Sequence, residues 1–268
     1  MSQPYDLTID QADLRAGIES LSPMGVRFVR RILDSLSSPL QAAVSNTWLG
    51  QTPGWAEYFG LTISVHHGTT TEPLGLVSFE VAFRNACEAV GWTVDEPGSA
   101  TQRFVDMTIQ TGYGEERKLS LKSTAAQRLS EATAHISKLT EAAWIQDVRS
   151  AKTRRDHTLD LFRQYRSAVD AIVILRAFRP DRTAIPAKYQ LLEIPTDVFA
   201  SLEDAPLDAF AADGPTIDCT YQDDPAAARI SLDRSDAKIT VKQIKLTACT
   251  IHAEWHMPVS PVSQANSQ

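Results

Sequence analysis

Cysteine is scarce in this sequence, and neither a long apolar run nor a leader-like start is present. The three cysteines, Cys87, Cys219 and Cys249, lie too far apart for a disulfide framework or a zinc site. No run approaches the about 18 apolar residues of a membrane span, and residues 1–10 lack the basic and apolar stretches of a signal peptide. We therefore expect a cytoplasmic protein with reduced thiols and no membrane partner.

Positive charge is in deficit overall but concentrated in one segment. The net charge of −7 argues mildly against a general polyanion binder. Residues 117–166, however, carry 11 Lys or Arg against 5 Asp or Glu, whereas residues 1–116 carry 6 against 14. A cationic block in an acidic chain suits a phosphodiester substrate, and the alternative is the solvated face of a long helix.

The stretch from Arg103 to Lys122 predicts a β-hairpin. The two apolar-rich runs are Phe104–Ile109 and Leu119–Leu121, and the polar turn between them contains two glycines. Asp106 lies in the first run, and Ser120 and Lys122 share one face of the second because strand side chains alternate. A carboxylate beside a lysine near a sheet edge can bind a divalent metal and activate water. The alternative is a surface hairpin with an isolated Asp and a solvated Lys.

Hydrophobic periodicity predicts the rest of the chain. Helical spacing predicts helices at Met24–Leu36 (after the capping pair Ser22-Pro23), Leu76–Val90 and Lys138–Ser167. Alternating or β-branched-rich runs predict strands at Leu61–Val65, Ala168–Phe178, Tyr189–Ile194, Ala228–Leu232, Ile239–Leu246 and Thr250–Trp255. The segment Glu203–Pro225 is rich in Pro, Gly and Asp and predicts a loop.

These elements predict an α/β or α+β fold with a mixed central β-sheet flanked by helices. The 268 residues can bury a sizeable core. We expect one compact domain made of an N-terminal helical part (1–70), a core (71–200), a C-terminal β-rich part (201–257) and a disordered tail (258–268).

The order of helix, acid-bearing strand, strand ending in Lys, long helix and buried strand resembles the PD-(D/E)xK nuclease fold. The run HISKLTEAAWIQDVRSAKTRRDHTLDLF, which starts at His135, is similar to type II restriction endonucleases. In that superfamily two strand acids hold Mg²⁺, and a Lys two residues after the second acid positions or activates the attacking water. Asp106 matches the first acid and Lys122 the Lys. The resemblance covers residues 75–195 and implies Mg²⁺-dependent cleavage of double-stranded DNA at a short sequence by a homodimer.

Ser120 stands where the family has its second acid. Enzymes that resemble this pattern with Ser-x-Lys take the missing carboxylate from a Glu in the following helix, which makes Glu131 and Glu141 the candidates. We favour Glu141 because it lies in the predicted Lys138–Ser167 helix. Glu80, in the helix before the hairpin, is a further candidate ligand; the alternative is that it is only solvated.

The resemblance also implies that basic residues after the hairpin hold DNA phosphates rather than read bases. These residues are Lys138, Arg149, Lys152, Arg154 and Arg155. Two other functions remain open from the residues alone. One is a non-catalytic DNA-binding or assembly protein on a degenerate nuclease fold, which Ser120 favours. The other is a repair nuclease that recognises DNA structure.

Overall fold

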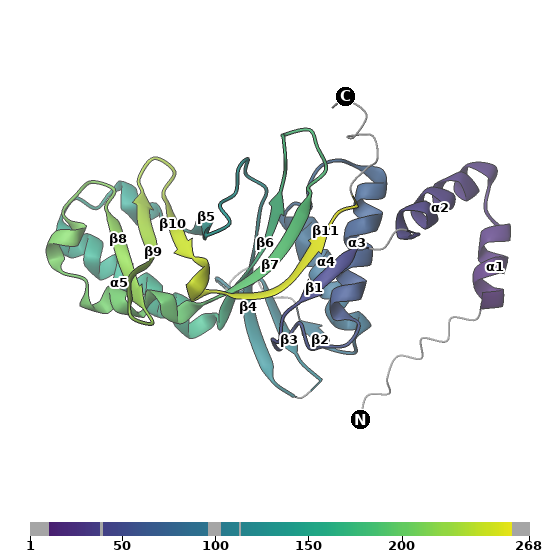
Figure 1. Cartoon of the computed structure of the whole chain (residues 1–268). Coiled ribbons are helices and arrows are strands. Elements are labelled where there is room, and N and C mark those ends of the chain that lie inside the picture. Colours follow the sequence, from purple (N-terminus) through teal and green to yellow (C-terminus); the bar gives the residue numbers. More distant parts are fainter. Residues whose placement is uncertain (1–10, 38–39, 96–102, 113, 259–268) are drawn as a thin grey trace.

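Two β-sheets and five α-helices make up the computed structural model, which describes residues 11–37, 40–95, 103–112 and 114–258 (Figure 1). The larger sheet has the strand order β1-β11-β7-β6-β4-β3-β2. Its strands are β1 (Gln41–Val44), β2 (Thr93–Asp95), β3 (Met107–Gln110), β4 (Glu116–Thr124), β6 (Ala171–Phe178), β7 (Lys188–Pro195) and β11 (Thr250–His256). Only β4 and β6 run parallel among its described pairs, so the sheet is mixed.

The smaller sheet is antiparallel and has the order β5-β10-β9-β8. Its strands are β5 (Thr133–Glu141), β8 (Thr216–Tyr221), β9 (Asp224–Asp233) and β10 (Lys238–Lys245). The two sheets interleave along the chain: β5 precedes β6 of the larger sheet, and β11 follows β10. The parallel connection from β4 to β6 therefore contains both β5 and the helix α5 (Ala151–Ala168).

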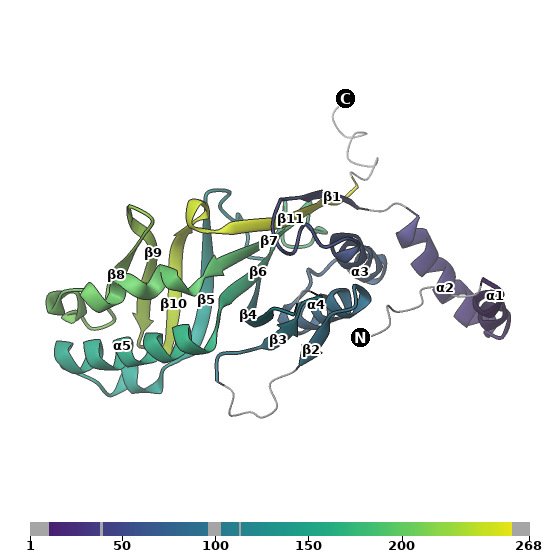
Figure 2. The ribbon, with the colours of Figure 1, turned by 90° about the horizontal axis from the view of Figure 1, so that it is seen from below.

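The two faces of the larger sheet are covered differently (Figures 1 and 2). The helices α3 (Trp55–Thr69) and α4 (Leu76–Ala89) pack on one face against alternate residues such as Leu121 and Val173. The other face packs on α5, the smaller sheet and the 3₁₀ helix η2 (Thr196–Asp204), through residues such as Ile172 and Ile174. The remaining 3₁₀ helices are η1 (Ala143–Gln146), η3 (Leu207–Phe210) and η4 (Leu246–Ala248).

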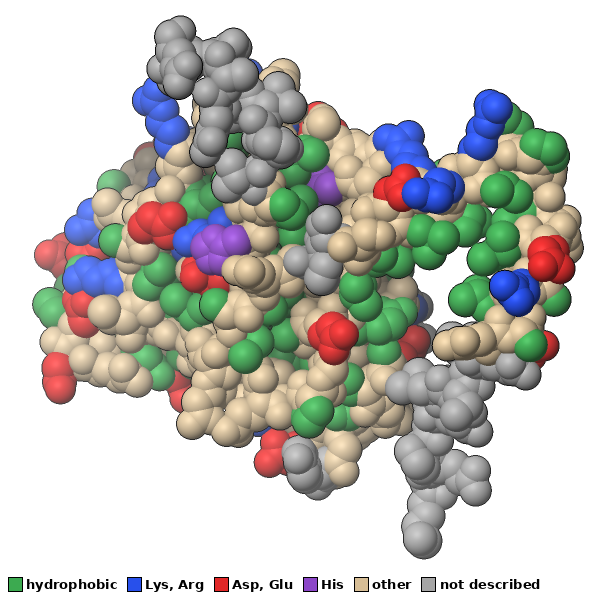
Figure 3. Space-filling model, turned by 45° about the vertical axis from the view of Figure 1, so that its right-hand side comes forward, with side chains coloured by type: hydrophobic (Ala, Val, Ile, Leu, Met, Phe, Trp, Pro, Cys, Tyr) green, Lys and Arg blue, Asp and Glu red, His purple; other side chains and the backbone are tan. Residues whose placement is uncertain are grey.

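Two helices, α1 (Gln11–Glu19) and α2 (Pro23–Leu36), form an arm that extends away from both sheets. The Ser22 hydroxyl accepts a hydrogen bond from the Gly25 backbone at 3.1 Å, which is the N-cap that the Ser22-Pro23 pair predicts. Met24 and Phe28 on the arm are 69% and 58% exposed. Hydrophobic side chains, drawn in green, accordingly show at the surface of the arm in Figure 3. None of the described helices is both long and apolar enough to cross a bilayer.

The predicted fold class is confirmed, as are the helices at Met24–Leu36 and Leu76–Val90 and the strands that correspond to β6, β7, β9, β10 and β11. The predicted strand Leu61–Val65 is wrong, because that segment lies inside α3, which is covered by apolar neighbours on several sides. The predicted loop Glu203–Pro225 is wrong in part, since it contains η3 and β8. The predicted disordered tail, 258–268, lies outside the described residues apart from Pro258.

The predicted helix Lys138–Ser167 is also wrong. Its first residues belong to β5, and only residues from Ala151 onward form α5. In β5 the side chains of Ala134 and Ile136 are buried while that of His135 between them is exposed, which is the period of a strand. Pairing with β10, about a hundred residues later in the chain, fixes this conformation and overrides the local helical signal.

Candidate active site

The hairpin predicted from the sequence is present as β3 and β4. Met107 pairs with Leu119 in an antiparallel register, and the Asp106 amide donates to the Leu119 carbonyl at 2.9 Å. Asp106 therefore lies directly before β3, beside Ser120 on the neighbouring strand. The hairpin is not the edge of the sheet, because β2 lies outside β3 and β6 lies inside β4.

Asp106, Ser120 and Lys122 form a connected group, which we call the hairpin cluster. The Asp106 Oδ2 atom accepts hydrogen bonds from Ser120 Oγ at 3.1 Å, from the Leu121 amide at 2.7 Å and from Lys122 Nζ at 3.0 Å. Lys122 Nζ also donates to Ser120 Oγ at 2.9 Å and to the Leu121 carbonyl at 3.0 Å. The lysine ammonium is thus held by three oxygen atoms of different kinds.

The hairpin cluster lies on the sheet face that packs against α5. Ser120 is opposite Ile172 and Lys122 is opposite Ile174 in the parallel register of β4 and β6. The cluster is partly open to solvent, because the side chains of Lys122 and Asp106 are 18% and 32% exposed. A reacting group can therefore approach Asp106 without unfolding the sheet.

The residues before Asp106 hold it in place through an unusual backbone conformation. Phe104 has φ = 77°, a left-handed value that is uncommon for a residue other than glycine. Its ring packs at 5.1 Å between centroids on Tyr165 of α5. The entry to β3 is therefore anchored to α5 directly beside the cluster.

The donor set suits a hard divalent cation in part. The Lys122 ammonium is itself a cation, and it contacts a carboxylate, a hydroxyl and a backbone carbonyl. Its position is therefore lined by oxygen atoms. The contacts of Asp106 converge on Oδ2, which leaves Oδ1 unengaged by the described residues. Mg²⁺ takes oxygen ligands and keeps several waters, so one carboxylate and one carbonyl are a sufficient start. Within the described ranges, however, no three His, Cys, Asp or Glu residues lie close enough together to hold a metal.

The three predicted additional acids lie apart from the hairpin cluster in different ways. Glu141 ends β5 rather than lying in a helix, and its side chain is 79% exposed and bound to Lys138 Nζ at 2.6 Å. That hydrogen bond lowers the pKa of Glu141. The carbonyl of Glu141 accepts a hydrogen bond from Arg103 at 3.4 Å, so the end of β5 lies beside the start of the hairpin.

Glu131 and Glu80 lie in other parts of the molecule. Glu131 is paired with Lys188 Nζ at 3.1 Å, near the far end of β6 and β7. Glu80 belongs to α4, which packs on the opposite face of the larger sheet from Ser120 and Lys122.

The predicted phosphate-binding residues have different surroundings. Arg154 is only 4% exposed, and its guanidinium donates to three backbone carbonyls, those of Phe210, Ala211 and Arg149. Arg155 likewise donates to the Glu203 and Ala205 carbonyls. Lys138, Arg149 and Lys152 are exposed and lie on β5, before α5 and in its first turn, respectively.

A second polar group, which the sequence did not reveal, lies on the opposite face of the larger sheet. Glu193 Oε2 accepts hydrogen bonds from Trp48 Nε1 at 2.8 Å and interacts with His252 Nε2 at 3.1 Å, and His252 Nδ1 contacts Thr47 Oγ1 at 2.9 Å. Arg117 lies over the Trp48 ring at 4.5 Å. We call Glu193, His252, Trp48 and Arg117 the β7 cluster. Its only sequence signal is an acid inside the apolar run YQLLEI.

The charged state of Glu193 is favoured inside this cluster. Burial by itself raises the pKa of Glu193, but the hydrogen bond and charge of His252, the Trp48 hydrogen bond and the charge of Arg117 outweigh it. The net effect lowers the pKa below its ordinary value. The β7 cluster is closed, because the His252 side chain is fully buried and that of Glu193 is 16% exposed.

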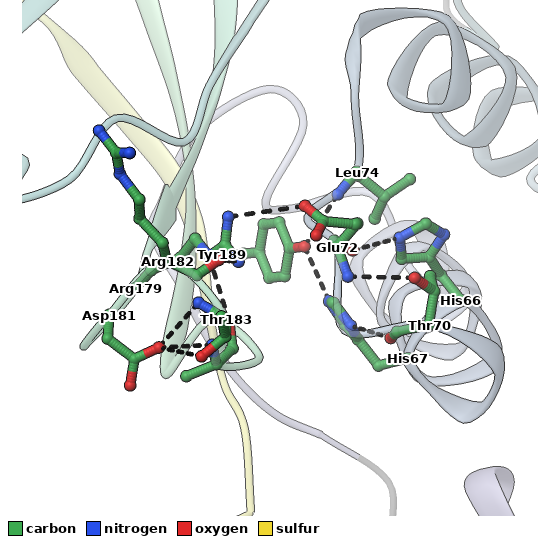
Figure 4. Close-up of polar contacts among 11 residues, drawn as sticks. His66, His67, Thr70, Glu72, Leu74, Arg179, Asp181, Arg182, Thr183 and Tyr189 are labelled. Atoms are coloured by element: carbon green, nitrogen blue, oxygen red, sulfur yellow. Dashed lines mark hydrogen bonds and ion pairs between the residues drawn. The ribbon is translucent and has the colours of Figure 1, made fainter.

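The end of α3 is tied to β7 by a third set of polar contacts (Figure 4). Tyr189 Oη lies 2.8 Å from His67 Nε2 and accepts a hydrogen bond from the Leu74 amide at 3.0 Å. His66 Nε2 contacts the Glu72 carbonyl at 2.7 Å. Burial lowers the pKa of His67, which favours its neutral form. The adjacent histidines thus hold the loop after α3 against the sheet.

The chain is similar to one curated protein of known class. It is 25% identical over 214 residues to "Type II restriction enzyme SmaI" of Serratia marcescens, and the match covers 76% of this chain and 80% of that protein. No protein-family model matches the chain, and no solved structure matches it significantly. The similarity supports a function like that of a restriction endonuclease.

Proposed function

We propose that this protein is a Mg²⁺-dependent type II restriction endonuclease that hydrolyses phosphodiester bonds of double-stranded DNA at a short specific sequence. The hairpin cluster is the observation that carries the proposal, because it joins a partly exposed carboxylate and a lysine on one face of a sheet. The similarity to a type II restriction enzyme supports the same reaction class. The strand order and the β4-β6 parallel pair are compatible with a PD-(D/E)xK core.

Asp106 and the Leu121 carbonyl are the proposed metal ligands. Both oxygens contact the Lys122 ammonium, so they already face a positive charge and would hold a divalent cation in its place. When bound, Mg²⁺ supplies a Lewis acid for the scissile phosphate and acidifies a coordinated water. Lys122 would then orient the attacking water and stabilise the negative charge that develops on the phosphate. Ser120 keeps the freed carboxylate in position through its hydroxyl.

Glu141 is the proposed second acid. Its strand ends beside Arg103, three residues before Asp106, and its exposed side chain is restrained by one surface ion pair. Such a pair contributes only about 0–1 kcal/mol, so a bound metal can replace Lys138 as the partner of Glu141. Glu131 is the weaker candidate, because Lys188 and the far end of β6 hold it. Glu80 is also a weaker candidate for the metal, because α4 lies on the face of the larger sheet opposite the hairpin cluster.

Replacing the two acids separately tests this choice. We expect Glu141→Gln to lower the cleavage rate about 10²-fold or more and to raise the Mg²⁺ concentration at half-maximal rate, because it removes a metal ligand. Glu131→Gln is the matched control, since it also removes an exposed acid that is paired with a lysine, and it should leave both quantities near wild type. The opposite pattern would transfer the role to Glu131.

DNA phosphates are the proposed partners of the exposed basic residues Lys138, Arg149 and Lys152. They lie on consecutive elements between β5 and α5, and lysine and arginine at such positions fix DNA in register without reading bases. Arg154 and Arg155 instead bind backbone carbonyls in and around η2 and η3, so we assign them a structural part in this surface. We propose a homodimer, which matches a palindromic site with two equivalent centres.

A non-catalytic DNA-binding protein is the second candidate function. Ser120 replaces an acid, and the described residues contain no cluster of three potential metal-binding side chains, which favours this alternative. Incubation of the full chain with plasmid and phage DNA plus Mg²⁺ distinguishes the two. Discrete fragments support a sequence-specific endonuclease, whereas mobility shifts without cleavage support the binder. Smears or cuts confined to junctions would instead indicate a structure-specific repair nuclease.

A further inference from the structure

The phenol of Tyr165 lies buried directly beside the hairpin cluster. Tyr165 is in the last turns of α5 and has no exposed surface. Besides burial, the groups that influence the pKa of its hydroxyl are the Ser120 side chain and the Asp106 charge. The hydroxyl nevertheless makes no hydrogen bond of ordinary geometry with a described residue. Burial raises the pKa of Tyr165, so the phenol keeps its proton.

A buried hydroxyl without a partner is uncommon in native proteins and calls for an explanation. The ring of Tyr165 cannot simply turn to find another partner, because aromatic neighbours fix it. Phe104 lies at 5.1 Å and Phe199 at 6.4 Å between ring centroids. The hydroxyl is therefore held next to Ser120, although no hydrogen bond of ordinary geometry joins the two side chains.

The hydrogen-bonding capacity of Ser120 leaves room for a bond from Tyr165. A serine hydroxyl donates one hydrogen bond and accepts two. Ser120 Oγ donates to Asp106 Oδ2 and accepts from Lys122 Nζ, which leaves one acceptor position for Tyr165. When Lys122 turns toward the attacking water, Ser120 loses the one donor that the described residues give it. A phenol beside it then becomes the donor that keeps the serine hydroxyl directed at Asp106.

We propose that Tyr165 is a positioning residue of the active site, whose hydroxyl holds Ser120, and through it Asp106, once Lys122 engages the reaction. This inference rests on the proposed function of the hairpin cluster. It explains why serine serves at this strand position: its hydroxyl connects α5 to the metal-binding carboxylate. Tyr165 itself need not touch DNA or metal.

A double-mutant cycle between Tyr165 and Ser120 tests the inference. Tyr165→Phe keeps the ring and removes only the hydroxyl. We expect its thermal midpoint in metal-free buffer to be no lower than that of wild type, because no formed hydrogen bond is lost. With Mg²⁺ we expect its single-turnover cleavage to fall about tenfold, the effect of one active-site hydrogen bond. The Ca²⁺ concentration that supports half-maximal binding of a cognate duplex, read by fluorescence anisotropy, should rise by a similar factor.

Repeating the Tyr165→Phe change in a Ser120→Ala background separates a positioning role of Tyr165 from a packing role. If Tyr165 acts through Ser120, Ser120→Ala/Tyr165→Phe cleaves as fast as Ser120→Ala alone, and Tyr165→Phe causes no further shift in Ca²⁺ dependence there. Tyr189→Phe is the matched control: this second buried tyrosine bonds to His67 and the Leu74 amide on the opposite face. It should lower the thermal midpoint and leave cleavage at permissive temperature unchanged.

Three outcomes overturn the inference. These are wild-type cleavage and Ca²⁺ dependence in Tyr165→Phe, equal effects of Tyr165→Phe with and without Ser120, or a thermal midpoint that falls as far as that of Tyr189→Phe. A wild-type protein that binds DNA with Ca²⁺ but cuts none with Mg²⁺ would contradict the proposed reaction instead. In that case the Ca²⁺ anisotropy cycle still decides whether Tyr165 acts through Ser120.

Discussion

Two polar clusters occupy opposite faces of the same sheet, and they differ in what their acids can do. Leu121 of β4, Val173 of β6 and Glu193 of β7 lie in one row across the strands, on the face covered by α3 and α4. Ser120 and Lys122, the neighbours of Leu121, point to the other face. The hairpin cluster and the β7 cluster are therefore separated by the thickness of one sheet.

The two clusters differ in how fully the acid is hydrogen-bonded and in how far it is exposed to solvent. In the β7 cluster every contact of Glu193 comes from a buried or half-buried group, and His252 is in turn bound to Thr47. In the hairpin cluster the described residues leave one carboxylate oxygen without a hydrogen bond, the acid is 32% exposed, and the Lys122 ammonium supplies the positive charge. A closed, fully bonded group of this kind holds structure together, whereas an open group with an exchangeable cation can take part in chemistry.

The largest expected effect is on the open cluster. Asp106→Asn should reduce DNA cleavage about 10³-fold, because it removes the proposed metal-binding charge, while DNA binding in Ca²⁺-free buffer stays near wild type. Asp170→Asn is the matched control, since Asp170 also accepts a backbone hydrogen bond from β4, from the Lys118 amide at 2.7 Å. Equal losses in the two variants would show that both carboxylates only support β4.

Removing the charge of the closed cluster should have the reverse profile. Glu193→Gln leaves His252 and Trp48 without their carboxylate, which should lower the free energy of unfolding by about 1–3 kcal/mol in urea titrations. Cleavage measured well below the thermal midpoint should remain within about threefold of wild type, because the sheet separates Glu193 from Asp106. A loss of cleavage as large as that of Asp106→Asn would place Glu193 in the catalytic machinery.

The acid dependence of stability should separate the clusters more finely. The pKa of Glu193 is lowered in the folded protein, so its stabilising contribution is fully present above the unfolded value, about 4.3. That contribution is lost as pH falls from there through the folded pKa. Glu193→Gln should therefore flatten the fall of unfolding free energy below about pH 4.3. Glu203→Gln, which changes a more exposed acid with a lowered pKa, should flatten it less.

The smallest expected effect concerns the histidine at the end of α3. Burial lowers the pKa of His67, so the folded protein resists its protonation, and its stabilising contribution is complete above the unfolded value of about 6.5. Unfolding free energy should fall slightly as pH decreases below that value, and His67→Gln should remove this step. If His67→Gln showed the same fall in unfolding free energy between pH 7 and 5 as the wild type, His67 would not be the neutral group responsible for it.

The parts of the site that local sequence encodes could be predicted. Alternation and turn glycines indicate the β3-β4 hairpin, and a period of two places Ser120 and Lys122 on one face. Glu193 and His252 could not be paired in advance, because they meet only through the register of β7 with β11. Similarly, Glu141 reads as helical in isolation and becomes a strand residue through its pairing with Lys238 of β10. Tyr165 reaches Ser120 only through the packing of α5.

Cleavage by two lysine variants of β4 tests the central claim most directly. Lys122→Ala and Lys118→Ala remove lysines from the same strand, but only Lys122 contacts Asp106, whereas Lys118 pairs with Glu116 at the surface. Single-turnover cleavage of a cognate duplex with Mg²⁺ should fall about 10³-fold in Lys122→Ala and remain near wild type in Lys118→Ala, with DNA binding retained in both. Wild-type cleavage by Lys122→Ala would show that the hairpin cluster is not the catalytic centre.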